Sequence, residues 1–164
     1  MKKVAVIMGS DSDLPIVEKA INVLRDYGVP HEVHVYSAHR TPRACAEFVA
    51  SAEENGFGVI IAAAGMAAHL AGAVAANTTL PVIGIPISSK NTGGMDALLS
   101  TVQMPSGIPV ATVAIDGAAN AATLAVEILA LSEPGLRDAL LATRAKATAA
   151  VFQKNADIEA KFNG

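Results

Sequence analysis

The chain has 164 residues, of which 52% are hydrophobic and 16% charged, and its formal net charge is −3. This length is enough to bury a substantial core, so we expect residues 1–164 to form one domain. No cluster of Lys and Arg marks a nucleic-acid or anionic-membrane partner, and no apolar run reaches the ~18 residues of a membrane span. The single cysteine, Cys45, excludes an internal disulfide and is typical of a protein of the reducing cytoplasm.

Short apolar runs typical of strands recur along the chain. The first, at residues 3–8, follows two lysines, as the apolar region of a signal peptide would. It stops at Gly9 and is too short for a signal's apolar region of ~7–15 residues plus a cleavage site, so we interpret it as a strand. With the later runs it predicts five strands, near residues 3–8, 31–36, 58–63, 81–87 and 108–115.

Helical periodicity fills the intervals between these strands. Apolar residues repeat at helical spacing from Leu14 to Leu24, and Gly28 ends that pattern. A second apolar face runs from Cys45 to Ala52, which gives the cysteine a packing role. Residues 67–76 carry a single histidine among small apolar residues, so this helix is expected to be buried nearly all round. Further helices are expected at residues 94–103, 118–132 and 134 to about 155.

Continuous apolar strands that alternate with helices predict a parallel sheet covered on both faces. Five strands fit the flavodoxin-like order 2-1-3-4-5, wound right-handedly as a three-layer α/β sandwich. The helix from residue 134 onward has no sixth strand to return to and is an extra C-terminal helix. Its apolar stripe, from Leu136 to Val151, could pack on the domain or on a neighbouring copy. The low charge content favours burial of part of the surface against other copies.

A histidine and an arginine directly follow the second predicted strand, within Ser37-Ala38-His39-Arg40-Thr41-Pro42. Ligands of open α/β sheets bind at the carboxyl ends of the strands, in the crevice where the strand order reverses. Histidine transfers protons near neutral pH, and the arginine guanidinium binds phosphate bidentately. We therefore predict His39 as a proton-transfer group and Arg40 as a phosphate clamp in the crevice between the first and third strands.

The loops after the first and third strands form the two lips of this crevice. The first is Gly9-Ser10-Asp11-Ser12-Asp13, where the glycine allows close backbone approach and the start of the next helix favours a phosphate. An alternative role for Ser12 or Asp13 is to cap that helix ahead of Pro15. Two aspartates would repel a phosphate, so at least one is expected to bind neutral hydroxyls such as those of a ribose. The second lip contains His69, which is either a core histidine or a ligand-binding one.

Several familiar catalytic motifs are missing from the sequence. It has no Gly-x-x-x-x-Gly-Lys-Ser/Thr phosphate loop, no paired-cysteine metal site and no Gly-x-Ser-x-Gly nucleophile elbow. His31 and His34 are three apart on a strand and therefore on opposite faces, so they cannot chelate a metal together. What remains is acid–base chemistry by a histidine on a small phosphorylated substrate.

The same segments resemble one enzyme family. The sequence is similar to the class I PurE family, the N5-carboxyaminoimidazole ribonucleotide mutases of purine biosynthesis, from near residue 4 to about residue 130. The matching blocks follow the family order and are Met8-Gly9-Ser10-Asp11-Ser12-Asp13, Ser37-Ala38-His39-Arg40-Thr41-Pro42, Ala67-Ala68-His69-Leu70, Met95-Asp96-Ala97-Leu98-Leu99-Ser100, Val102-Gln103-Met104-Pro105-Ser106-Gly107 and Asn120-Ala121-Ala122.

The resemblance implies a flavodoxin-like domain that assembles as a homo-octamer with active sites shared between subunits. It also implies that a carboxylate moves from the exocyclic nitrogen N5 to ring carbon C4 of a ribonucleotide, through CO2 and without ATP, metal or organic cofactor. By family analogy His39 is the general acid/base. A lid must keep CO2 in the site, and residues 88–94 are the candidate. The predicted substrate-binding residues are Ser10, Asp13, Arg40, Gly9, Ser12, Ser37, Ala38, Gly65, His69 and Leu70.

Three features depart from the family pattern. Met66 stands where many members have glycine, and Ala71 stands where many have proline. The segment 115–120 is about two residues shorter than in familiar members. These departures affect the wall of the crevice and the position of Asn120, but not the blocks that contain His39 and Asp13.

Three other classes of protein fit the sequence less well. Class II PurE enzymes, which carboxylate aminoimidazole ribonucleotide directly, have Ser-Ala-His-Lys in the second loop and lack the Ala-Ala-His-Leu block, so Arg40 and His69 favour class I. A receiver domain would need an aspartate at the end of the third strand, where this chain has Ala62-Ala63-Ala64, and a lysine at the end of the fifth, where it has Ile115-Asp116. A flavin carrier would need aromatic walls, and the chain has only two Tyr, four Phe and no Trp.

Overall fold

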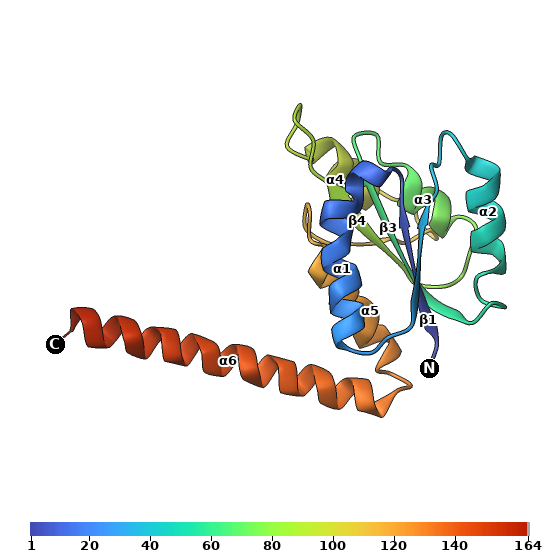
Figure 1. The fold of residues 1–164 in the computed structure, drawn as a ribbon. Helices are drawn as coiled ribbons and strands as arrows, with labels where there is room; N and C mark the ends of the chain where they lie inside the picture. Colours follow the sequence, from blue (N-terminus) through green and yellow to red (C-terminus); the bar gives the residue numbers. More distant parts are fainter. Residues whose placement is uncertain (164) are drawn as a thin grey trace.

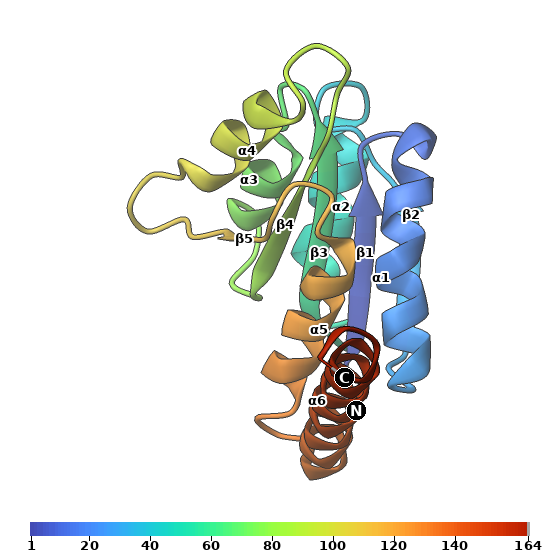
Figure 2. The ribbon, with the colours of Figure 1, turned by 90° about the vertical axis from the view of Figure 1, so that its left-hand side faces the viewer.

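Five parallel strands form the centre of the molecule. The computed structural model, which describes residues 1–163, places them in the order β2-β1-β3-β4-β5 (Figures 1 and 2). Each pair of neighbours runs parallel, which confirms the flavodoxin-like prediction. The strands are β1 (Lys3–Met8), β2 (His31–Val35), β3 (Phe57–Gly65), β4 (Val82–Ile87) and β5 (Ala111–Thr112).

Helices cover both faces of this sheet because successive strand residues point to opposite sides. In β1, Val4 and Val6 join the core on one face, while Ala5 and Ile7 join the core on the other. A Cβ on Gly84 of β4 would touch both Thr101 and Ala71, so the helices that carry these two residues share a face. The first face is covered by α1 (Leu14–Asp26) and α5 (Ala118–Leu129), and the second by α2 (Pro42–Ser51), α3 (Leu70–Ala75) and α4 (Met95–Val102) (Figure 2).

Strand β5 is much shorter than the predicted range of 108–115, which is wrong at both ends. Pro109 has no amide hydrogen to give to a strand ladder, so pairing begins only at Ala111. Ala111 and Thr112 lie opposite Ile83 and Gly84 of β4. Beyond Thr112 two further backbone bonds reach β4: Val113 N donates to the Gly84 carbonyl at 3.1 Å, and Asp116 N donates to the Pro86 carbonyl at 2.9 Å.

Helix α3 starts three residues later than predicted. Met66 has a φ of 56°, in the left-handed region, and His69 N donates to the carbonyl of Ala67 at 2.9 Å. Residues 67–69 therefore form a turn rather than the first helical turn. Within the helix Leu70, Ala71, Val74 and Ala75 are buried, but Gly72 and Ala73 are partly exposed. The prediction of a helix buried nearly all round is therefore wrong, and only one side of α3 is buried.

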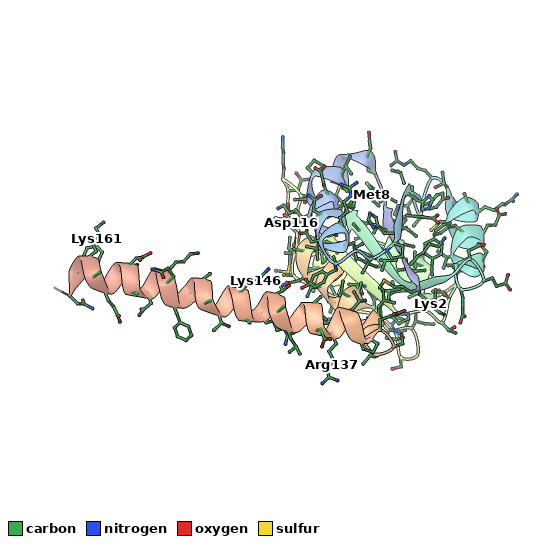
Figure 3. All side chains as sticks on the ribbon, turned by 60° about the horizontal axis from the view of Figure 1, so that its bottom comes forward. Lys2, Met8, Asp116, Arg137, Lys146 and Lys161 are labelled. Atoms are coloured by element: carbon green, nitrogen blue, oxygen red, sulfur yellow. The ribbon has the colours of Figure 1, made fainter. Side chains whose placement is uncertain are left out.

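The C-terminal helix α6 (Pro134–Phe162) is longer than predicted and projects away from the domain (Figures 1 and 3). Leu136 and Leu140 pack into the core beside α5. Beyond them the apolar side chains are uncovered, and Val151 and Phe152 are 65% and 70% exposed. Only the first part of the apolar stripe thus packs on its own domain. No helix within residues 1–163 combines the length and apolar character needed to cross a membrane.

Candidate active site

One cavity gathers all the residues that the sequence predicts for the site. Its volume is about 590 Å³, and it is lined by residues at the carboxyl ends of β1 to β4. These strand ends form the upper edge of the sheet in Figure 2. The crevice between β1 and β3, where the strand order reverses, lies within the cavity. The predicted residues that line it are Gly9, Ser10, Ser12, Asp13, Ser37, Ala38, His39, Arg40, Gly65, His69 and Leu70.

The loop after β1 folds into a short 3-10 turn, η1 (Asp11–Asp13), before α1 begins. Ser10 caps this turn: its Oγ accepts from Ser12 N at 3.3 Å, and its own N–H donates to Asp13 Oδ2 at 3.2 Å. Asp13 occupies the N-cap position of α1 ahead of Pro15, in agreement with the role predicted for Ser12 or Asp13, but its side chain makes no cap hydrogen bond to α1. The Asp13 carboxylate instead completes the capping box of η1 together with Ser10.

Asp13 is the most deeply buried charged residue at the cavity, with 8% of its surface exposed. Burial raises the pKa of this carboxyl, and the nearby Asp11 adds to the increase. The hydrogen bond donated by Ser10 N acts in the opposite direction but does not cancel the effect of burial. A carboxyl group that lines a cavity, and whose ionisation is disfavoured by burial and by a neighbouring carboxylate, is a candidate for binding a ligand.

The loop after β2 is closed by its own hydroxyl groups. Ser37 N donates to Thr41 Oγ1 at 2.9 Å, and Arg40 N donates to Ser37 Oγ at 3.1 Å. The Arg40 guanidinium then reaches the first loop, where Nη2 donates to the Gly9 carbonyl at 3.3 Å. A fixed positive charge is thereby placed next to the N-terminal end of α1, and both features attract an anion.

His39 and His69 meet across the cavity. His39 Nε2 lies 2.6 Å from His69 Nδ1, and the two rings are nearly perpendicular, at 76°. At this distance one nitrogen must donate and the other accept, so the two facing nitrogens share one proton. His69 is exposed and lines the cavity, so it is not a core histidine. Nothing in the sequence indicated that the two rings are in contact.

Other residues of the cavity were not assigned to the substrate site from the sequence. Met66, which is 59% exposed, and Ile87, at the end of β4, are among them. Ser88 and Ser89 also line the cavity and begin the segment that was predicted as a lid. Ile87 could have been identified from the sequence, because it ends the fourth parallel strand and the carboxyl ends of such strands line ligand sites.

A larger hollow, of about 960 Å³, lies at the opposite edge of the sheet. It is lined by residues 75–82 and 107–109 and by Ala50, Glu53 and Ala111. Glu53 is the one titratable side chain among these lining residues. His31 and His34 lie outside both hollows: the first contacts the Val29 carbonyl, and the second packs on Phe48. Of these two hollows, the smaller one is the one lined by histidine and arginine side chains.

The strand order defines a flavodoxin-like α/β protein. Its cavity lies at the crevice between β1 and β3, where proteins of this class bind small molecules, and is lined by histidine, arginine, serine and aspartate side chains. A family model described as AIR carboxylase matches residues 3–150. The N5-carboxyaminoimidazole ribonucleotide mutase of Pyrococcus abyssi is 59% identical over 140 residues, which cover 85% of this chain and 80% of that protein. The protein of the same name from Mycobacterium tuberculosis strain H37Rv is 50% identical over 157 residues, covering 96% and 90%.

A solved structure agrees with these sequence matches. The crystal structure of Treponema denticola PurE matches this chain with a TM-score of 0.82 and 27% identity, and the match covers 98% of both chains. The resemblance to PurE that the sequence blocks indicated is confirmed. The chain belongs to the AIR carboxylase family.

Proposed function

We propose that this protein is an N5-carboxyaminoimidazole ribonucleotide mutase, an isomerase of de novo purine biosynthesis. It moves the carboxylate from N5 to C4 to give 4-carboxy-5-aminoimidazole ribonucleotide. The names and the coverage of its relatives support this activity. The observation that carries the proposal is the 2.6 Å contact between His39 and His69, in a cavity that Arg40 also lines. The reaction needs a proton carrier and a phosphate site in the same cavity.

The reaction proceeds in two steps through CO2. The bond between N5 and the carboxyl carbon breaks, CO2 leaves, and His39 gives a proton to the nitrogen, which keeps the electron pair. Ring carbon C4 then attacks CO2, and the hydrogen on C4 leaves as a proton that returns to His39. One proton is given and one is taken back, so the sum is an isomerisation without change in charge or oxidation state.

His69 assists this exchange by fixing the His39 ring through their shared proton. Arg40, Ser10 and Ser12 bind the phosphate near the start of α1. Asp13 accepts hydrogen bonds from the ribose hydroxyls, which suits a carboxylate better than contact with a phosphate would. Ser37, Ala38, Gly9, Gly65 and Leu70 complete the walls.

Replacing Asp13 by Asn is expected to weaken substrate binding without weakening the fold. The amide keeps an oxygen for Ser10 N, but it loses the charge that strengthens bonds from ribose hydroxyls, so we expect KM to rise about tenfold. Because burial raises the pKa of Asp13 in the folded state, its ionisation opposes folding as the pH rises past the ordinary value of 3.8. The variant should therefore be at least as stable as the wild type at pH 7.

This expectation is checked by urea unfolding at pH 7 and at pH 3, together with steady-state kinetics. Any stability advantage of the variant should disappear at pH 3, where the wild-type carboxyl is protonated in both states. A variant that is less stable at pH 7 but binds substrate normally would show that Asp13 serves the fold alone.

We also propose that the protein works as a homo-octamer in the cytoplasm, with sites shared between subunits. The exposed apolar side chains of α6, among them Val151, Phe152 and Ile158, support assembly because water is an unfavourable environment for them. Light scattering at low micromolar concentration is expected to give the mass of eight chains. A stable monomer would contradict both the assembly and the sharing of sites.

The activity itself is tested with purified protein and the carbamate substrate, without ATP and in the presence of a chelator. Formation of the C4-carboxylated product is expected, whereas a class II PurE would form it from the unsubstituted amine and CO2. Product formation from the amine and bicarbonate alone, with no use of the carbamate, would overturn the proposal.

A further inference from the structure

The segment that connects β4 to α4, residues 88–94, folds back on itself above the sheet (Figure 2). Gly93 N donates to the Ser89 carbonyl at 3.0 Å, and the hydroxyls of Ser89 and Thr92 lie 3.3 Å apart. Gly94 has a φ of 94°, and a Cβ there would lie 3.0 Å from Ser88 Cα. The two ends of the segment are therefore close together, as in a flap with a narrow base.

Asp116 holds one end of this flap. It belongs to the loop after β5. Its N–H donates to the Pro86 carbonyl at 2.9 Å, and its Oδ1 accepts from Ser88 N at 2.9 Å. Asp116 thus binds the backbone on both sides of Ile87, at the point where β4 ends and the flap begins.

The conformation of Asp116 fits this role. Its φ is 57°, in the left-handed region, which few residues other than Gly, Asn and Asp adopt readily. The preceding Ile115 approaches the other end of the flap, because a Cβ on Gly94 would lie 2.7 Å from Ile115 Cγ2. Ile115 and Asp116 together therefore contact both ends of the segment.

We infer that Asp116 is a positioning residue that anchors the flap 88–94 over the cavity and so keeps Ser88 and Ser89 in its wall. The expected consequence of this anchor is that CO2 is retained between the two steps of the reaction. That consequence rests on the proposed function. Asp116 is not among the residues that line the cavity, so it acts through the Ser88 backbone and not on the substrate. Without the anchor the flap opens more often, and CO2 escapes before C4 captures it.

Two substitutions separate the anchor from the backbone conformation. Asp116→Asn keeps an oxygen acceptor and tolerates the left-handed region, whereas Asp116→Gly tolerates that region even better but removes the acceptor. We expect the Asn variant to stay within about threefold of the wild type in kcat/KM, and the Gly variant to fall about tenfold. The Gly variant should also divert a larger share of carbamate substrate to the decarboxylated amine, which a loss of general stability would not do.

Amide hydrogen exchange provides a readout that does not depend on activity. The Ser88 amide is expected to exchange about tenfold faster in the Gly variant, and at the wild-type rate in the Asn variant. Equal behaviour of the two variants, in exchange or in the share of amine released, would overturn the inference. A wild-type protein without mutase activity would overturn the proposed function instead, and the exchange comparison would still decide whether Asp116 anchors the flap.

Discussion

Replacing His39 by Asn is expected to lower kcat by at least ~10²-fold, the usual scale for loss of a general acid/base. The amide can still form hydrogen bonds, but it cannot give a proton to N5 and take another from C4. The side chain is exposed and lies in a loop, so the fold and the assembly should not change. Steady-state kinetics with the carbamate substrate, combined with light scattering on the same sample, measures both expectations.

His69→Asn is the matched control for this experiment. It removes the partner of the 2.6 Å contact but leaves the proposed proton carrier in place, so we expect a smaller loss than for His39→Asn. A correctly assembled His39→Asn variant with near-normal turnover would rule out His39 as the catalytic group. A larger loss in the His69 variant would exchange the roles of the two histidines.

Replacing Arg40 by Lys is expected to weaken substrate binding about tenfold or more, with a smaller effect on kcat. The guanidinium donates from Nη2 to the Gly9 carbonyl at 3.3 Å and from Nε to Ser37 Oγ at 3.5 Å, and a planar guanidinium can bind a phosphate bidentately. An ammonium group keeps the charge but cannot reproduce this geometry. Binding of the product ribonucleotide, measured by calorimetry, should decrease accordingly.

The dephosphorylated nucleoside is the control for the Arg40 variant. Its affinity should be the same for the wild type and for Arg40→Lys, since the proposed contact of Arg40 is with the phosphate. If the substitution weakens binding of the nucleotide and of the nucleoside by equal factors, Arg40 is not the phosphate clamp.

The sheet order could be predicted because its cause lies in local patterns. Strands such as β3 and β4 are apolar on both faces, and this requires a parallel sheet with helices on both sides. The predictions were wrong where one residue interrupts an otherwise suitable pattern. Pro109 delays β5, and the left-handed Met66 delays α3, although the composition around both residues fits the predicted element.

The candidate site could be predicted as a set of residues but not as a set of contacts. Topology alone brings the loops after β1, β2 and β3 to one edge, and this explains why the predicted residues line one cavity. The contact between His39 and His69 and the bond between Asp116 and Ser88 join residues about 30 positions apart. Such pairs depend on side-chain directions that no periodicity encodes.

The class of chemistry is tested most directly by following the transferred carbon. The carbamate substrate is labelled at its carboxyl carbon and supplied in buffer with excess unlabelled bicarbonate, and the label at C4 is measured over the first turnovers. A mutase that keeps CO2 in a closed site should retain most of the label in the product. Dilution of the label to the ratio of the bulk bicarbonate would contradict the account and indicate a carboxylase that takes CO2 from solution.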